Sequence, residues 1–200
     1  MHGILGHTKY SRFAGTSTER DFVECPSQAL ENWCWEPSIL ARVSEHYQTK
    51  TPLPEEIIQK MVAAKKVNTG LTNLRQIFFG VFDQTVHSQE KVDSEAVYSD
   101  LRTRITKIKH TPGTNPTGNF GHLMGGYDAS YYGYLWSEVF SADVFSVFQA
   151  NGVMDQQTGR RYKEEILSKG GSEDAQNYLQ RFLGREPNQK AFLKDLGIDE

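Results

Sequence analysis

The chain has 200 residues, of which 38% are hydrophobic and 12% aromatic, and its formal net charge is -3. This composition excludes an intrinsically disordered chain and suits a domain with a buried core. The slightly acidic balance also excludes the strongly basic surface by which proteins usually bind nucleic acid, so we expect no nucleic-acid partner.

Hydrophobic residues recur at three- and four-residue steps along most of the chain, which predicts an almost entirely helical protein. Prolines and glycines divide this pattern into segments. The expected helices cover residues 19–35, 37–47, 55–67, 71–87, 94–105, 128–150, 158–167, 172–183 and 189–196. Pro26 must lie in the first turn of its helix or kink it. Residues 111–121 have the composition of a loop, and no alternating strand pattern exceeds about four residues, so we expect an all-α fold.

Membrane-spanning and secretory segments are not indicated. No apolar run approaches the roughly 18 residues that cross a bilayer, so no membrane partner is expected. The first residues lack the basic and apolar regions of a secretory signal. The cysteines are Cys25 and Cys34, too few for a disulfide framework, which favours a reducing compartment.

The segment 120–136 holds one histidine, four tyrosines and four glycines. A helix that begins near Tyr127 would place Tyr131 and Tyr134 on the same face, because seven residues come within about 20° of two full turns. Tyr132 would point elsewhere. Neutral phenols beside a glycine-rich hinge can bind a polar group and stabilise developing negative charge. The alternative is a buried aromatic seam in which the glycines permit close helix packing.

A second polar cluster surrounds Glu24. With Ser27, Gln28 and Glu31, it falls on one face of the expected helix. A carboxylate with an amide one turn further on can be a metal ligand with its hydrogen-bonding partner. The alternative is that the acidic residues of this first turn only favour the helix dipole.

Complete catalytic motifs are absent from the sequence. His2 and His7 are five residues apart, whereas paired helical zinc ligands are four apart, as in H-E-x-x-H. Neither that motif nor Cys-x-x-Cys, G-x-x-x-x-G-K-[ST] or G-x-S-x-G occurs. The residues alone therefore indicate a cleft rich in hydrogen-bond donors and a candidate carboxylate, without a complete catalytic set.

Several long strings point to a relationship. They are F-A-G-T at 13–16, E-R-D-F-V-E-C-P-S-Q at 19–28, T-G-L-T-N-L-R-Q-I at 69–77, residues 111–136, residues 170–174, and R-F-L-G-R-E-P-N at 181–188. On these strings the chain resembles the C-terminal catalytic region of the thimet oligopeptidase and neurolysin family of zinc oligopeptidases. The resemblance covers essentially the whole chain.

The resemblance implies a multi-helix C-terminal part of a zincin-type oligopeptidase catalytic domain, with residues 1–200 forming a single partial domain. It implies a zinc-dependent metalloendopeptidase that hydrolyses short peptides, with one Zn²⁺ per complete active site. Glu24 matches the family's third zinc ligand. The positions that contact the scissile bond and stabilise the tetrahedral intermediate match His122, Tyr127 and Tyr134. The substrate-binding positions match Tyr131 and Arg20.

The chain departs from the family in one large respect. In the family, an H-E-x-x-H helix supplies two zinc-ligand histidines and the general-base glutamate, directly before a segment that resembles Met1-His2. Those residues are absent here. A zinc ion held by Glu24 alone would be labile, since catalytic sites use about three protein ligands, so we expect the isolated chain to be inactive.

Two origins are open. The chain is either a fragment, from an incomplete gene model or an internal start codon, or a genuine short product that has lost catalysis. The intact set of Glu, His and Tyr residues favours the fragment.

A rival function needs no metal. It is that of a non-catalytic helical peptide-binding or interaction protein that keeps the donor-lined groove. For the complete enzyme we expect a monomer in the cytoplasm, with the mitochondrion as the alternative location.

Overall fold

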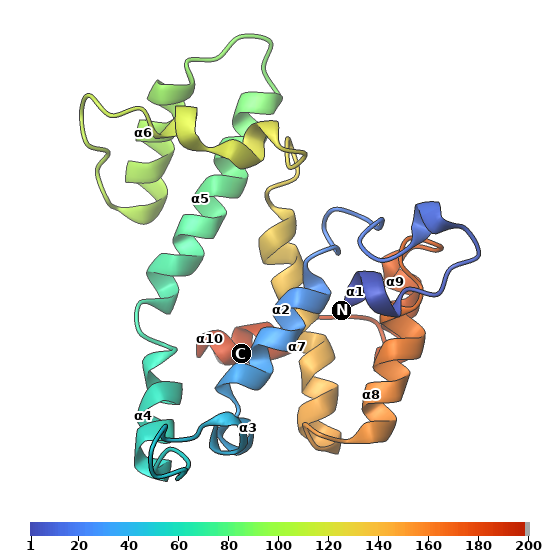
Figure 1. Ribbon diagram of the computed structural model, residues 1–200. Helices are drawn as coiled ribbons and strands as arrows, with labels where there is room; N and C mark the ends of the chain where they lie inside the picture. The colour runs from blue at the N-terminus through green and yellow to red at the C-terminus, as the bar shows by residue number, and fades with distance from the viewer. Residues whose placement is uncertain (199–200) are drawn as a thin grey trace.

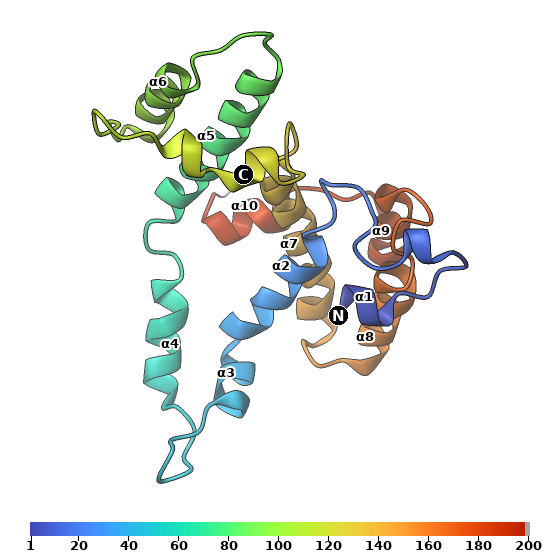
Figure 2. The ribbon, with the colours of Figure 1, turned by 45° about the horizontal axis from the view of Figure 1, so that its top comes forward.

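The structure, a computed structural model, describes residues 1–198 and consists of helices and turns (Figures 1 and 2). No strand occurs among these residues, which confirms the all-α prediction. The α-helices are α1 (His2–Leu5), α2 (Cys25–Glu31), α3 (Pro37–Val43), α4 (Glu55–Ala64), α5 (Thr69–His87), α6 (Ser94–Thr106), α7 (Gly133–Asn151), α8 (Gln156–Tyr162), α9 (Ala175–Leu183) and α10 (Lys190–Leu196). The short segments are the 3-10 turns η1 (Ser11–Phe13), η2 (Asn32–Trp35), η3 (Pro116–Asn119) and η4 (Gly121–Met124), and the π-helical η5 (Lys163–Leu167).

Each helix expected from the periodicity is present, but the two that lie next to the candidate site residues begin at least five residues later than expected. The helix expected from residue 19 begins at Cys25, with Pro26 in its first turn, where a missing N–H costs nothing. The helix expected from residue 128 begins at Gly133. In both cases the residues before the helix form turns, and these turns contain Glu24, Tyr127 and Tyr131.

The larger core lies where α7 packs against α2, α8 and α9. Figure 1 shows α2 and α7 side by side at the centre of the molecule, with α8 and α9 on the opposite side from α4 and α5. The buried side chains of this larger core are Phe22, Cys25, Ala29, Val144, Phe145, Phe148, Tyr162, Ile166, Leu167, Ala175, Tyr178, Leu179 and Phe182. α7 is therefore the central helix of this core.

A second core joins α5 to α6 and holds the loop that contains His122. Phe78 and Phe82 of α5 pack on Tyr98 and Leu101 of α6. Phe120, just before η4, stacks on Phe82 with ring centroids 6.3 Å apart. This contact anchors the glycine-rich segment to α5. Within residues 1–198, none of the helices combines the length and apolarity that crossing a bilayer requires.

The two cysteines should differ in reactivity. Cys25 is fully buried, and this burial raises the pKa of its thiol, whereas Cys34 is exposed. A thiol reagent such as DTNB should therefore react with Cys34 alone in the native chain and with both cysteines after unfolding in guanidinium chloride. Cys34→Ser should abolish the native reaction. Rapid native labelling of Cys25 would contradict the packing of α2 on α7.

Candidate active site

The start of α7 lies against the turn that precedes α2. A Cβ on Gly133 would lie 2.8 Å from the carbonyl oxygen of Arg20 and 3.1 Å from Asp21 Cα, so only glycine fits without a shift of the backbone. One turn later, Ser137 Oγ donates a hydrogen bond to the carbonyl oxygen of Asp21 at 2.7 Å. This contact places the tyrosine segment beside Arg20 and Glu24.

Four rings from this segment meet at one place. The His122 ring centroid lies 5.7 Å from that of Tyr127, 5.3 Å from that of Tyr131 and 5.6 Å from that of Tyr134. Tyr127 and Tyr134 are stacked with centroids 4.9 Å apart, and Tyr131 lies 5.2 Å from Tyr134. The predicted catalytic residues His122, Tyr127 and Tyr134 and the predicted substrate-binding Tyr131 are therefore neighbours.

The three tyrosines are grouped as predicted, but the predicted cause is wrong. Because α7 begins only at Gly133, Tyr127 and Tyr131 do not share a helix face with Tyr134. Turns bring them together instead: Gly126 and Ala129 have φ values of +90° and +53°, in the left-handed region. The chain folds back at these residues.

Tyr132 lies outside the cluster, as the spacing predicts. Its hydroxyl lies 3.4 Å from Asp21 Oδ2, and its side chain is exposed. The ring therefore faces the turn before α2 and makes none of the ring contacts that join His122 to the other three tyrosines. This position makes Tyr132 a matched reference for substitutions within the cluster.

Glu24 receives two hydroxyl hydrogen bonds. It is the N-cap residue of α2, where Tyr127 donates its hydroxyl to Oε1 and Ser27 Oγ donates to Oε2 at 3.2 Å. Gln28, expected as the partner of this carboxylate, donates instead from Nε2 to the backbone carbonyl of Tyr134 at 3.0 Å. That expectation is wrong because the packing of α2 on α7 directs the Gln28 amide to α7.

Arg20 completes this side of the cluster. Its guanidinium carbon lies 4.9 Å from the Tyr127 ring centroid, a cation–π contact, and its side chain is exposed. A positive group thus covers the ring whose hydroxyl is bound to Glu24. The predicted metal ligand Glu24 and the predicted substrate contact Arg20 therefore both touch Tyr127.

The surroundings of Tyr127 and Tyr131 favour the neutral form of their hydroxyls. Burial raises the pKa of Tyr127 well above its usual value, and the hydrogen bond to Glu24 raises it further. Burial also raises the pKa of Tyr131, with a further contribution from Tyr134. Both phenols are therefore protonated at neutral pH and can act as hydrogen-bond donors. Such donors can stabilise negative charge that develops on a bound carbonyl oxygen.

A cavity opens beside the rings. It has a volume of about 430 Å³ and is lined by His122, Tyr131 and Tyr134, together with residues of α2, α5 and α10. Gln28 and Gln76 add amide groups to its wall. Its size lies within the range of small-ligand sites, about 300–1,000 Å³.

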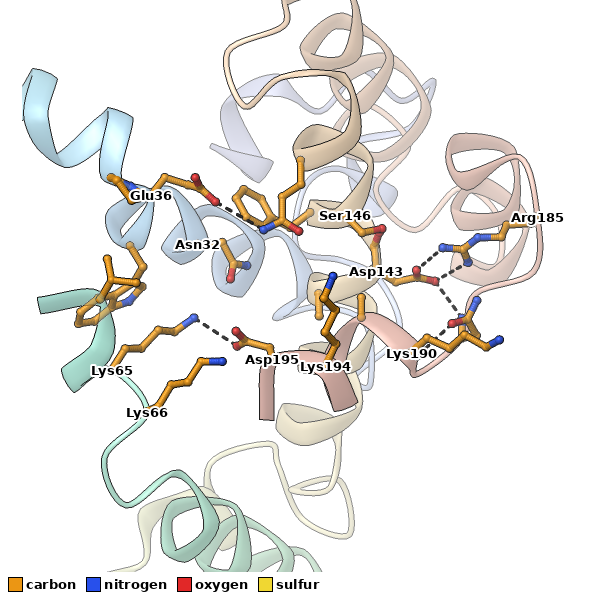
Figure 3. Close-up of a pocket in the computed structure, with 18 residues that line it drawn as sticks. Asn32, Glu36, Lys65, Lys66, Asp143, Ser146, Arg185, Lys190, Lys194 and Asp195 are labelled. Atoms are coloured by element: carbon orange, nitrogen blue, oxygen red, sulfur yellow. Dashed lines mark hydrogen bonds and ion pairs between the residues drawn. The ribbon is translucent and has the colours of Figure 1, made fainter. Parts of the chain in front are cut away.

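A second cavity of about 580 Å³ is drawn in Figure 3 and has five lining residues in common with the first, namely Asn32, Trp35, Lys65, Ala142 and Asp195. Its charged residues are partly paired, as Arg185 binds Asp143 and Lys65 binds Asp195. None of the predicted site residues lines it. His122, Tyr131 and Tyr134 line the smaller cavity, whereas Glu24, Tyr127 and Arg20 do not, so we place the candidate site where the ring cluster borders the smaller cavity.

Asp83 is the main residue of the site region that the sequence analysis missed. Its carboxylate accepts hydrogen bonds from the backbone N–H groups of Ala129 and Tyr131, at 3.0 and 2.9 Å. The sequence signal that could have found it is the i, i+4 spacing of Asp83 and His87 on α5, whose side chains lie 2.9 Å apart.

The residues present do not form a zinc site by themselves. Among residues 1–198, no group of three or more His, Cys, Asp or Glu side chains is arranged to hold a metal ion. Glu24 offers one carboxylate, whereas catalytic zinc sites use about three protein ligands. Zinc binding therefore stays a prediction of the family resemblance.

Comparisons with known proteins agree with that resemblance. The pattern of Peptidase family M3 matches residues 1–198. The chain is 42% identical to thimet-like oligopeptidase of Dictyostelium discoideum, 41% to oligopeptidase A of Escherichia coli and 40% to saccharolysin of Saccharomyces cerevisiae, each over 99% of the chain. It spans only about 30% of the length of these curated relatives.

The close approach at Gly133 can be tested by adding one methyl group. Gly133→Ala should lower the free energy of unfolding by about 1–3 kcal/mol, because the new Cβ meets backbone atoms that cannot move aside alone. Gly159→Ala is the matched control, since a Cβ there meets nothing within 4 Å. It should stabilise α8 by up to about 1 kcal/mol. Urea unfolding measures both, and equal effects would refute the contact.

Proposed function

Because the chain belongs to peptidase family M3, we propose that it contributes part of the active site of a zinc-dependent metalloendopeptidase that hydrolyses short peptides. The observation that supports this most directly is the meeting of His122 and three tyrosines beside Glu24. We also propose a monomer located in the cytoplasm, with the mitochondrion as the alternative.

Each residue has a role in this proposal. Glu24 is one ligand of a zinc ion whose other ligands lie outside the described residues. Tyr134, with His122 or Tyr127, donates hydrogen bonds to the oxyanion of the tetrahedral intermediate. Tyr131 and Arg20 position the peptide. The raised pKa of Tyr127 means that the phenol keeps its proton at neutral pH, and its single O–H donates to Glu24, so Tyr127 can serve the oxyanion only when that hydrogen bond is released.

A chimera tests the oxyanion assignment. This chain replaces the matching third of Escherichia coli oligopeptidase A, to which it is 41% identical, and the product is assayed with a quenched-fluorescent peptide. Tyr134→Phe should lower kcat by about 10²–10³-fold, the usual cost of losing one such donor. Tyr132→Phe is the matched control, because its ring lies outside the cluster, and it should leave kcat nearly unchanged. An active chimera in which Tyr134→Phe has no effect would show the assignment to be wrong.

The rival is a metal-independent peptide-binding protein. One observation favours it: the cluster and the Tyr127–Glu24 hydrogen bond are formed by this chain's own residues. Isothermal titration of the isolated chain with a short peptide, with and without zinc, separates the two. We expect weak binding in both conditions, because the residues present make only part of a site. Tight binding without zinc would favour the rival.

A further inference from the structure

The turn between Tyr127 and α7 is held by α5 through one carboxylate. Asp83 Oδ1 accepts a hydrogen bond from Ala129 N at 3.0 Å, and Oδ2 accepts one from Tyr131 N at 2.9 Å. Each oxygen therefore satisfies one N–H of the turn. The residues joined are 46 and 48 positions apart, so this is a cap supplied by a distant helix.

The carboxylate is fully buried, and its surroundings fix its orientation. Asp83 is 0% exposed, and a buried charge requires partners for its oxygens. Besides the two N–H groups, His87 Nδ1 lies 2.9 Å from Oδ1, and its hydrogen bond is with the backbone carbonyl oxygen of Asp83, also at 2.9 Å. The two backbone N–H groups are therefore the hydrogen-bond donors that orient the carboxylate. The oxygens are therefore held in a single arrangement against the turn.

Two further contacts from α5 support the same turn. Gln84 Nε2 donates to the carbonyl oxygen of Ala129 at 2.7 Å. Phe79, one helical turn before Asp83, packs on the Tyr131 ring with centroids 5.5 Å apart. Ala129 has φ +53°, which is unfavourable for a residue other than glycine and persists only where neighbouring groups enforce it. α5 thus holds both the backbone and the ring.

We infer that Asp83 is a positioning residue for the tyrosine cluster. By fixing the turn, Asp83 sets the position of Tyr131 and the orientation of the Tyr127 and Tyr134 side chains on either side of the turn. The catalytic consequence rests on the proposed function, because donors stabilise an oxyanion only when held in the correct geometry. A displacement of about 1 Å can cost about 10²-fold in rate.

The chain contains a matched control for this inference. Asp143 of α7 is also buried, accepts the Asn188 N–H at 2.9 Å and pairs with Arg185. It is thus a second buried carboxylate that caps a distant segment, and it touches none of the site tyrosines. Any effect due only to the loss of a buried charge should appear equally in Asp143→Asn.

The first experiment uses the 200-residue chain itself. Asp83→Asn keeps the size of the side chain but turns one acceptor into a donor that faces an N–H group. Hydrogen exchange should accelerate at Ala129 and Tyr131 by roughly tenfold, the equivalent of one net hydrogen bond. The NMR signals of ¹³C-labelled Tyr127, Tyr131 and Tyr134 should shift or broaden. Asp143→Asn should leave both measurements at the turn unchanged.

A milder pair of variants keeps the test decisive if Asp83→Asn does not fold. Gln84→Ala removes an exposed side chain that binds the Ala129 carbonyl. Gln89→Ala removes an exposed side chain that binds the Thr85 carbonyl instead. Only Gln84→Ala should change the tyrosine signals. If Asp83→Asn folds, unchanged tyrosine signals in that variant would overturn the inference. If it does not fold, unchanged tyrosine signals in Gln84→Ala would overturn it. Equal changes in the control variants Asp143→Asn or Gln89→Ala would also overturn it.

The second experiment uses the chimera with oligopeptidase A. Asp83→Asn should lower kcat by about 10²-fold with a smaller change in KM, and Asp143→Asn should not. An inactive wild-type chimera would count against the proposed function, whereas the NMR comparison would still decide whether Asp83 positions the turn. An active chimera whose kcat is insensitive to Asp83→Asn would overturn the positioning role and leave the proposed function standing.

Discussion

The candidate site depends on a contact between two backbones at Gly133. There the first turn of α7 lies against the carbonyl of Arg20, with too little room for a Cβ. Because Glu24 follows Arg20 by one turn and Tyr134 follows Gly133, the same contact brings the carboxylate and the phenols together. The larger core, in which α2 packs along α7, continues this contact and makes it rigid.

The tyrosine cluster is held from two sides. On one side, Gln28 of α2 binds the backbone carbonyl of Tyr134. On the other, α5 binds the turn through Asp83 and packs Phe79 on Tyr131. Neither helix contributes a reactive group to the cluster, yet each limits where the hydroxyls can be. Donors held in this way lose little entropy when a carbonyl oxygen arrives, which is the basis of preorganised stabilisation.

The helices could be predicted from sequence because their signals are local. Hydrophobic spacing located α5 and most of α7, but it put the starts of α2 and α7 too early, and Pro26 left open whether its helix begins there or bends there. The helical spacing of the tyrosines predicts that they cluster, although Tyr127 precedes the helix. The prediction and the structure agree for a physical reason. The three tyrosine rings lie within eight residues, and the two residues with left-handed φ fold the backbone back, so the rings are forced close together. The long strings that identify the family predicted the membership, which no local pattern could.

Contacts between distant carboxylates and backbone N–H groups explain what could not be predicted. Local capping rules place the acceptor at the residue just before the helix. Asp93 is such an acceptor for α6. In this fold Glu19 binds the Ala175 N–H at the start of α9, Asp143 binds that of Asn188, and Asp83 binds two in the tyrosine turn. An aspartate in the middle of an amphipathic helix normally faces solvent. Only the packing of α5 against the turn makes Asp83 an interior residue, so the i, i+4 spacing to His87 could point to the residue but not to its role at the turn.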